Sequence, residues 1–583
     1  MQHPVPWTNA RRVTAVHVAA GVLFGITHAS MQSALDPAQW LAGLVDYPAG
    51  NPYGDYLSSV LNLQTLAAAA LLRAGVGEVG ISAFFCVAVS VLYLLFWQNV
   101  VGHYSRSNVL ALLVPQFLLG TGFLLAGLNY EIIIPPGQVT FGPLAIAWGA
   151  WAASLLLFRS DGIPLALVAL TGLFHPILGA YLGGACALAQ VVRREPQWRR
   201  AVGLLLGTAA CIGLQYALER HYATALAGSF DAGRLLELNL SKHRVPLEWN
   251  RTLALALLAT LLCALVHRAS IGDGPSARFL PAFLIVAAAG FLLAQVNHYP
   301  AGQLGTVARL VYASIPARNL NFLELLAAPL AVLAILAAAP WSAGLFLAAW
   351  CFQVWGIGGY FATEVVDGHP AHAPLLQFLE LPVLVLACAL VLRSLFLARP
   401  ALAFPERAAS HRSVRIATAV GPLLLALPCL WFQRQAPERN GYYGNDAVLQ
   451  LAATQVRGQL AVAGMGASFR TFPQARTRVA ILYDIQLAAT FAYLHVDPSA
   501  TLAMVRDVYG IDLLDPSRQG RINQQCDDLD CASVRELFDR RSSEQWRTLG
   551  ARYHFSHVLV PASWSLDMRS LGSDAQWRLY AVD

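Results

Sequence analysis

The chain has 583 residues, of which 57% are hydrophobic and only 12% are charged, whereas soluble domains carry about 25% charged residues. This composition excludes an ordinary soluble globular protein and predicts a chain with many membrane spans. The formal net charge of +6 is spread over short loops, as membrane topology requires, so no nucleic-acid partner is expected.

Apolar runs that suit membrane helices recur along the first three quarters of the chain. Arg11 and Arg12 precede the first run, which is too long for a cleavable signal and is predicted to stay in the membrane. The run at 163–175 is short for a straight crossing. We expect about thirteen spans, at 13–31, 81–101, 108–128, 141–158, 163–175, 177–192, 201–218, 251–267, 279–296, 319–339, 341–361, 376–397 and 414–432.

The placement of arginine predicts how these spans are oriented. Short connections near 106, 159, 193–200, 268–278 and 393–415 are rich in arginine, which favours the cytoplasmic side for them and for the N-terminus. An odd number of spans then leaves the tail outside. Residues 1–433 are therefore the predicted transmembrane domain. Within it, 32–76 form the first outer loop, closed by an interfacial or re-entrant helix over 56–76.

Residues 434–583 change character, because charge rises and long apolar runs end. Strands are predicted at 479–483, 556–560 and 577–582, and helices at 444–463, 485–495, 499–509 and 532–550. The pattern indicates a small extracytoplasmic α/β domain. Cys526 and Cys531 are its two cysteines, and outside the cytoplasm they are candidates for a disulfide.

The first outer loop carries three acids, Asp36, Asp46 and Asp55, and no Lys or Arg between them. A carboxylate here could act as a general base, or could hold Mg²⁺ or Mn²⁺ against a phosphate. Asp46 and Asp55 can converge if this Pro- and Gly-rich loop folds back. Asp36 precedes Pro37 and is interpreted as the N-cap of a helix over 37–45. The alternative for each acid is a solvated loop residue.

Three further positions could add to such a site. Glu131 is at a helix mouth on the same predicted side, as a possible partner in the site or a carboxylate facing water. His175 precedes Pro176 between two short apolar halves, which indicates helices meeting at the membrane edge. It could contact a phosphate or a metal, or be an ordinary core histidine. His369 and His372 form an His-x-x-His pattern with metal-ligand chemistry, interrupted by Pro370.

Outer-side cations are candidates for binding a phosphate. Arg318 is the strongest of them, because it immediately precedes a span and neighbours Asn319. His298 and Arg309 belong to the same predicted surface. Arginine offers a planar fork for phosphate oxygens, but interfacial arginine also anchors helices to lipid headgroups without a specific ligand.

This layout resembles the GT-C class of membrane glycosyltransferases: an N-terminus inside, an acidic first outer loop closed by an interfacial helix, many spans and an outer C-terminal α/β domain. The resemblance implies a polyprenyl-phosphate-linked sugar as donor and a glycan, lipid or protein outside the cytoplasm as acceptor. It also implies an inverting displacement in a bacterial inner membrane, with Asp46 or Asp55 as base. The acids are isolated here, whereas that class often has an adjacent pair. The chain is also similar to large bacterial polytopic membrane proteins of no assigned activity.

Two other functions stay open from the residues alone. A transporter or flippase of a lipid-linked or small solute would have paired broken helices and ionisable residues in mid-span. The run 172–184 is one broken-helix candidate without a partner, and the spans carry few charges. A non-catalytic membrane assembly protein would need the folded tail but not the loop acids.

Overall fold

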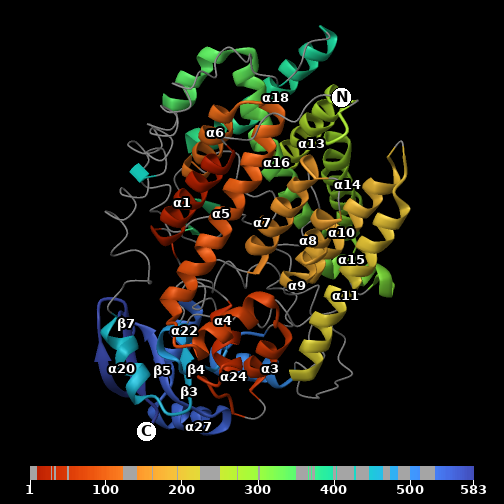
Figure 1. Cartoon of the computed structure of the whole chain (residues 1–583). Helices are drawn as coiled ribbons and strands as arrows, with labels where there is room; N and C mark the ends of the chain where they lie inside the picture. The colour runs from red at the N-terminus through yellow and green to blue at the C-terminus, as the bar shows by residue number, and fades with distance from the viewer. Residues whose placement is uncertain are drawn as a thin grey trace.

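The chain forms a large bundle of apolar helices followed by a small α/β tail, which lies at one end of the bundle (Figure 1). This computed structural model describes the following residues: 10–27, 29, 31, 34–48, 51–121, 141–159, 162–193, 195–222, 250–271, 273–299, 303–348, 365–366, 369–370, 374–397, 402, 426–427, 446–463, 473–483, 499–512 and 532–583. Glu131, His372, Cys526 and Cys531 lie outside them, as do the predicted helix at 485–495 and most of the predicted spans 341–361 and 414–432.

Six helices in the described part are long and apolar enough to cross a membrane. A hydrocarbon core of about 30 Å requires about 20 residues at 1.5 Å each. The six are α5 (Glu78–Ser105), α11 (Trp198–Tyr222), α13 (Arg251–Ala269), α14 with η3 (Ser276–His298), η5 with α16 (Pro316–Ala338) and Leu379–Phe396 of α18 (Pro374–Phe396). All six coincide with predicted spans, as expected for a polytopic membrane protein.

Other helices of the bundle are shorter than a membrane crossing or less apolar. They are α1 (Ala10–Thr27), α6 (Asn108–Thr121), α7 (Phe141–Ser154), η2 (Leu155–Leu157), α8 (Ile163–Ala169), α9 (Thr171–Phe174), α10 (Pro176–Val191), α15 (Thr306–Ser314) and η6 (Pro340–Ser342). His175 has extended backbone, with φ −156° and ψ 108°, and separates α9 from α10. The predicted meeting of two short helices at His175-Pro176 is therefore confirmed.

Helix α16 (Leu320–Ala338) lies at the centre of the bundle. It packs against α5, α6, α7, α13, α14 and α18, and nearly all of its residues are buried. A helix that is apolar on every face is stable only when neighbours surround it. The Trp97 indole N–H of α5 donates to the carbonyl of Leu325 at 3.0 Å, which links the two helices.

Three helices form the stretch predicted as the first outer loop: α2 (Leu35–Leu41), α3 (Pro52–Ser59) and α4 (Leu63–Arg73). The single helix predicted over 56–76 is thus wrong, because the chain breaks at 60–62. The Asn62 side chain accepts a hydrogen bond from the Thr65 N–H at 2.9 Å and begins a new helix. The predicted cap at Asp36 is also wrong. Ala34 is the N-cap of α2, and Asp36 lies in its first turn.

The tail contains a five-stranded sheet of order β4-β3-β5-β7-β6. β3 is parallel to β4 and β5, and the other two pairs are antiparallel. The strands are β3 (Gln459–Val462), β4 (Ala480–Ile481), β5 (Phe555–Pro561), β6 (Arg569–Ser573) and β7 (Trp577–Ala581). The helices are α20 (Ala447–Gln455), α22 (Pro473–Thr477), α24 (Ser499–Tyr509), α26 (Ala532–Arg540) and α27 (Ser543–Tyr553). The predicted α/β character is confirmed, but the predicted helix 444–463 ends early and gives way to β3.

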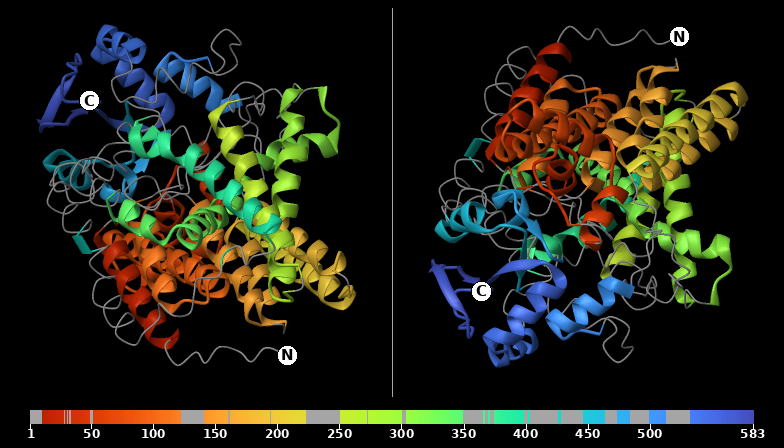
Figure 2. Two further views of the ribbon diagram at one scale, coloured as in Figure 1. Left: turned by 90° about the horizontal axis from the view of Figure 1, so that it is seen from above. Right: turned by 90° about the horizontal axis from the view of Figure 1, so that it is seen from below.

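The first outer loop is part of the hydrophobic core of the tail. Tyr53, Tyr56 and Leu57 of α3 are buried in the same apolar cluster as the residues of the tail sheet. The other large cluster lies within the helical bundle. Seen from below, the tail lies to one side of the bundle end (Figure 2). The loop therefore connects the two apolar cores.

Candidate functional site

The first outer loop is anchored to the tail by a set of polar contacts. The carboxylate of Glu78, at the start of α5, pairs with Arg478 at 2.7 and 3.1 Å. The Gln39 side-chain amide donates to the same carboxylate at 2.9 Å and to the carbonyl of Ala475 at 3.0 Å. The Glu78 carboxylate raises the pKa of Arg478 above its usual value. These contacts fix α2 against α22 and against the N-terminal end of α5.

Two further side chains extend this interface along the loop. Gln474 of α22 donates to the carbonyl of Asp36 at 3.1 Å and accepts from the Tyr47 hydroxyl. The side-chain amide of Asn51 donates to the side chain of Gln459 in β3. The Asn51 Oδ1 accepts from the Tyr53 N–H at 2.7 Å, which caps α3. Asn-Pro at residues 51–52 is a strong helix start. The loop conformation is therefore set both by local capping and by the tail.

The chain folds back between Asp46 and Asp55. A Cβ on Gly54 would lie only 2.9 Å from the Cβ of Tyr47, so a larger residue at this position would collide with the tyrosine. Asp46 directly precedes Tyr47 and Asp55 directly follows Gly54, so the two predicted acids flank this contact. Asp46 is exposed and forms no hydrogen bond or ion pair with the described residues. Asp55 lies in α3, where the structure describes its backbone.

Asp36 has a different environment from Asp46. Its side chain is buried, and its Oδ2 accepts from the Tyr53 hydroxyl at 3.0 Å. The rings of Tyr47, Tyr53 and Tyr56 follow one another at centroid distances of 5.9 and 5.5 Å. Asp36 thus supports the tyrosines that shape the loop, while Asp46 is available to a partner from solvent.

His175 caps α10 and lies near the turn that contains Arg318. The Leu178 N–H donates to its Nδ1 at 3.4 Å, so the ring proton of the neutral imidazole is on Nε2. His175 lies outside the six membrane-length helices. A neutral imidazole N–H and a guanidinium are both hydrogen-bond donors to phosphate oxygens.

The turn at residues 315–319 is held in a strained shape. Ile315 has φ +49°, in the left-handed region that a β-branched residue rarely adopts, and η5 (Pro316–Asn319) follows it. Tyr181 of α10 and Ser314 of α15 share a hydrogen bond of 2.9 Å. Such strain persists only where surrounding contacts impose it, and it is frequent at functional sites. Here it determines where Arg318 leaves the turn.

Packing connects the loop to the His175 turn. α4 packs against α9, and α3 packs against α11. α9 and α11 both contact α10, which in turn packs on α14, and α14 contacts η5. The loop acids and the two donors therefore belong to neighbouring elements at one end of the bundle. His298 is exposed at the end of η3, and Arg309 is half-buried in the adjacent α15. Their proposed phosphate contacts stay predictions.

Of the four predicted metal ligands, only Asp46 has a side chain within the part of the chain that the structure describes. No group of three or more His, Cys, Asp or Glu side chains there could hold an ion. The backbone of His369 pairs with Val366 in a short antiparallel ladder, β1 (Val365–Val366) with β2 (His369–Pro370). The metal roles of Asp46, Asp55, His369 and His372 stay predictions.

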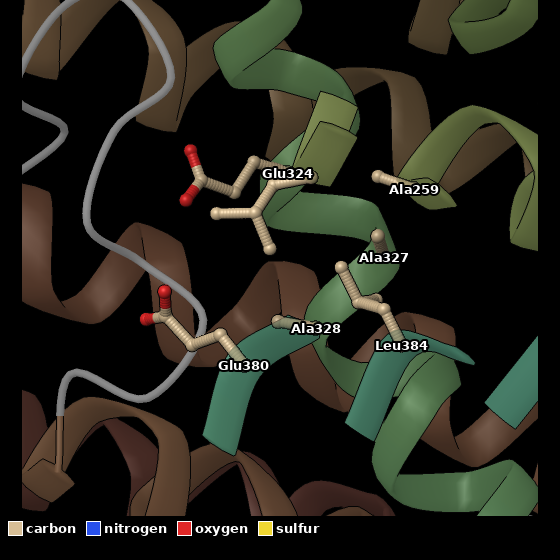
Figure 3. Close-up of a pocket in the computed structure, with 7 residues that line it drawn as sticks. Ala259, Glu324, Ala327, Ala328, Glu380 and Leu384 are labelled. Carbon is tan, nitrogen blue, oxygen red and sulfur yellow. The ribbon is translucent and has the colours of Figure 1, made fainter. Parts of the chain in front are cut away.

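A small pocket between α13, α16 and α18 contains two carboxylates that the sequence analysis missed. Glu324 and Glu380 are both buried, and their side chains extend to the same side of the gap between α16 and α18 (Figure 3). Arg251 pairs with Glu380 at 2.6 Å. The cavity has a volume of about 20 Å³, enough for a single water molecule. A single acid within an apolar span often marks a functional site. The predicted spans 319–339 and 376–397 each contain one such acid.

Comparison with known proteins adds no relative to this picture. No protein-family model matches the chain, and no curated protein shows significant similarity to it. The functional argument therefore depends on the residues and their geometry.

Proposed function

We propose that the protein is a membrane glycosyltransferase that moves a sugar from a polyprenyl-phosphate donor to an extracytoplasmic acceptor. One observation carries the proposal: the first outer loop folds back where Tyr47 meets Gly54, so the chain at Asp46 lies next to the chain leading to Asp55. This loop packs through α4 on α9, which directly precedes His175, and through α3 on α11.

The proposal includes a GT-C-like topology of about thirteen spans, with a cytoplasmic N-terminus and the tail outside a bacterial inner membrane. The course of α5 supports this orientation. Its 28 residues extend about 42 Å, more than a bilayer core requires. The tail contacts its first residue, Glu78, and the Arg-rich connection that contains Asp273 contacts its other end at His103.

In the proposed reaction, Asp46 takes the proton from an acceptor hydroxyl. The hydroxyl oxygen forms a bond to the anomeric carbon of the donor sugar as the bond from that carbon to the phosphate oxygen breaks, with inversion. The leaving polyprenyl phosphate keeps the electron pair. The Arg318 guanidinium and the His175 Nε2–H stabilise its charge. Asp36 acts as a positioning residue, through Tyr53.

A divalent cation has no step in this mechanism. The two donors at His175 and Arg318 supply positive potential for the phosphate, and a role for Mg²⁺ or Mn²⁺ beside the loop acids stays a prediction.

The test uses the full chain in nanodiscs with radiolabelled undecaprenyl-phosphate hexoses and pentoses, and measures sugar release to water or to added membrane acceptors. Asp46→Asn is expected to lower turnover by about 10²- to 10⁴-fold, with unchanged binding of undecaprenyl phosphate. Asp539→Asn, on the exposed face of α26, is the matched control. Full activity in both Asp46→Asn and Asp55→Asn would refute the assignment.

Donor binding is tested separately. Arg318→Gln is expected to weaken binding of undecaprenyl phosphate by about tenfold or more, because it removes a charged donor to the phosphate. Arg457→Gln, at an exposed tail position, should bind normally. Equal binding by the two variants would contradict the phosphate role of Arg318.

A second candidate function, proton- or cation-coupled transport, is favoured by one observation. Glu324 and Glu380 are carboxylates within apolar helices and border one pocket, as in membrane proteins that carry ions or protons. Proteoliposomes loaded with a pH-sensitive dye distinguish the two functions. Proton movement that is abolished by Glu324→Gln, without any sugar release, would favour transport.

A further inference from the structure

Three arginines from three segments lie near one another at the end of the bundle opposite the tail. Arg193 follows α10, Arg200 lies in the first turn of α11 and Arg278 in the first turn of α14. α10 packs against both α11 and α14. The charges of Arg193 and Arg200 both act on the Arg278 guanidinium. All three side chains are half-buried. We call them the arginine cluster.

The connection between α10 and α11 is built so that Arg193 and Arg200 stay close. The Gln197 N–H donates to the carbonyl of Gln190 at 2.9 Å, and the Arg200 N–H donates to the carbonyl of Gln197 at 3.0 Å. Arg193 donates to the Gln190 side chain at 3.1 Å. The backbone therefore turns sharply and returns the chain beside its starting point.

The arginine cluster has little negative charge to balance it within the described residues. Asp273 is the acid whose charge acts on Arg278, but its carboxylate already contacts His103 at 2.8 Å and Ser276 at 2.5 Å. Glu195 lies in the same connection and is exposed. Bringing three like charges together out of bulk water is unfavourable unless an anion compensates them.

The surroundings of the arginine cluster match the surface of a bilayer. His103, which contacts Asp273 in the connection before Arg278, is 25 residues along α5 from Glu78, so His103 lies about 38 Å from the tail interface. Large apolar side chains beside it face outward: Val192, Trp198 and Ile271 are 60%, 62% and 62% exposed. Guanidinium groups next to exposed apolar side chains can accept both the headgroup and the acyl part of a lipid.

We propose that the arginine cluster binds the phosphate of an anionic glycerophospholipid in the leaflet opposite the tail. The guanidinium forks donate to phosphate oxygens, and Trp198, Val192 and Ile271 contact the glycerol and upper acyl region. A dissolved phosphate would use only the charges and would leave these apolar groups in water. This inference is independent of the sugar-transfer proposal.

The test measures lipid retention by the full chain with native mass spectrometry, after reconstitution with phosphatidylglycerol, with diphosphatidylglycerol or with phosphatidylcholine alone. The triple variant Arg193→Gln, Arg200→Gln, Arg278→Gln is expected to bind the anionic lipids about tenfold or more weakly, since charged donors to the phosphate are lost. Arg268→Gln is the matched control, because Arg268 is exposed in the last turn of α13 at the same end. It should retain the lipid like the wild type.

Wild-type measurements keep the proposal testable if the triple variant does not fold. Retention of anionic lipid should exceed that of phosphatidylcholine and should fall as salt rises, and millimolar inorganic phosphate should not displace the lipid. Equal retention of neutral and anionic lipids, or equal retention by the triple variant and Arg268→Gln, would overturn the proposal. Displacement by inorganic phosphate would also overturn it, in favour of a site for free phosphate.

Discussion

The ion pair between Glu78 and Arg478 offers a direct test of how the tail is attached to the bundle. Two hydrogen bonds join the side chains, at 2.7 and 3.1 Å. Glu78 is 13% exposed and Arg478 is 46% exposed, so water screens the pair on one side only. An exposed pair contributes at most about 1 kcal/mol, and a charged hydrogen bond that is partly shielded contributes somewhat more. We expect a coupling energy of about 1 kcal/mol, or about fivefold in the equilibrium for local opening.

A double-mutant cycle of Glu78→Gln and Arg478→Lys measures this coupling. Lysine keeps the charge but cannot form the bidentate contact. Hydrogen exchange of peptides from α22 and β3, recorded by mass spectrometry in nanodiscs, reports the opening. Each single variant should exchange about fivefold faster, and the double variant little faster than either. Arg506→Lys, in an exposed tail ion pair, should change nothing. Unchanged exchange in Arg478→Lys, or strictly additive effects, would refute the reasoning.

Three further outcomes follow from the structure. Burial lowers the pKa of His557 below 6.5 in the folded tail, so near this pH the unfolded chain binds more protons than the folded chain. Thermal stability of the tail should therefore fall as the pH drops through 6.5, and His557→Gln should reduce this pH dependence. Gly179→Ala should lower the melting temperature, because its Cβ would lie 2.4 Å from the Gly172 Cα, whereas Gly184→Ala, in the same helix with open space, should not. Glu380→Ala should be less stable than Glu380→Gln in thermal melts, since truncation removes the side-chain oxygen that accepts from the Arg251 guanidinium, whereas glutamine keeps such an oxygen.

Length and composition were sufficient to predict the coarse fold. Long apolar runs have few solutions other than membrane helices, and β4, β5 and β7 of the tail showed ordinary strand patterns. The edge strand β6 was not predicted. β3 was missed because Gln459–Val462 is buried on both faces, so no alternation distinguishes it from the end of the preceding helix. The break at 60–62 was missed because an asparagine within a mostly apolar run gives only a weak stop signal.

The candidate site was predictable only in its residue types. Acids in a Pro- and Gly-rich loop were evident, but the different roles of Asp36 and Asp46 depend on Tyr53 and Gln474, and Gln474 is more than 400 residues away in the chain. No local pattern encodes such a contact. The His-Pro break was predictable because the restriction imposed by Pro176 is local. Its relation to Arg318 was not, because that relation depends on the packing of α10 against the α15 turn.

The central proposal is that the first-loop acids border one chamber at the tail end of the bundle together with His175 and Arg318, the two proposed hydrogen-bond donors to the phosphate. A cryo-electron microscopy structure of the full chain in nanodiscs with undecaprenyl phosphate tests it most directly. We predict density for the phosphate within hydrogen-bond distance of the Arg318 guanidinium and the His175 Nε2, with the Asp46 carboxylate open to the same space. A phosphate bound elsewhere, with Asp46 and Arg318 on separate surfaces, would contradict the account.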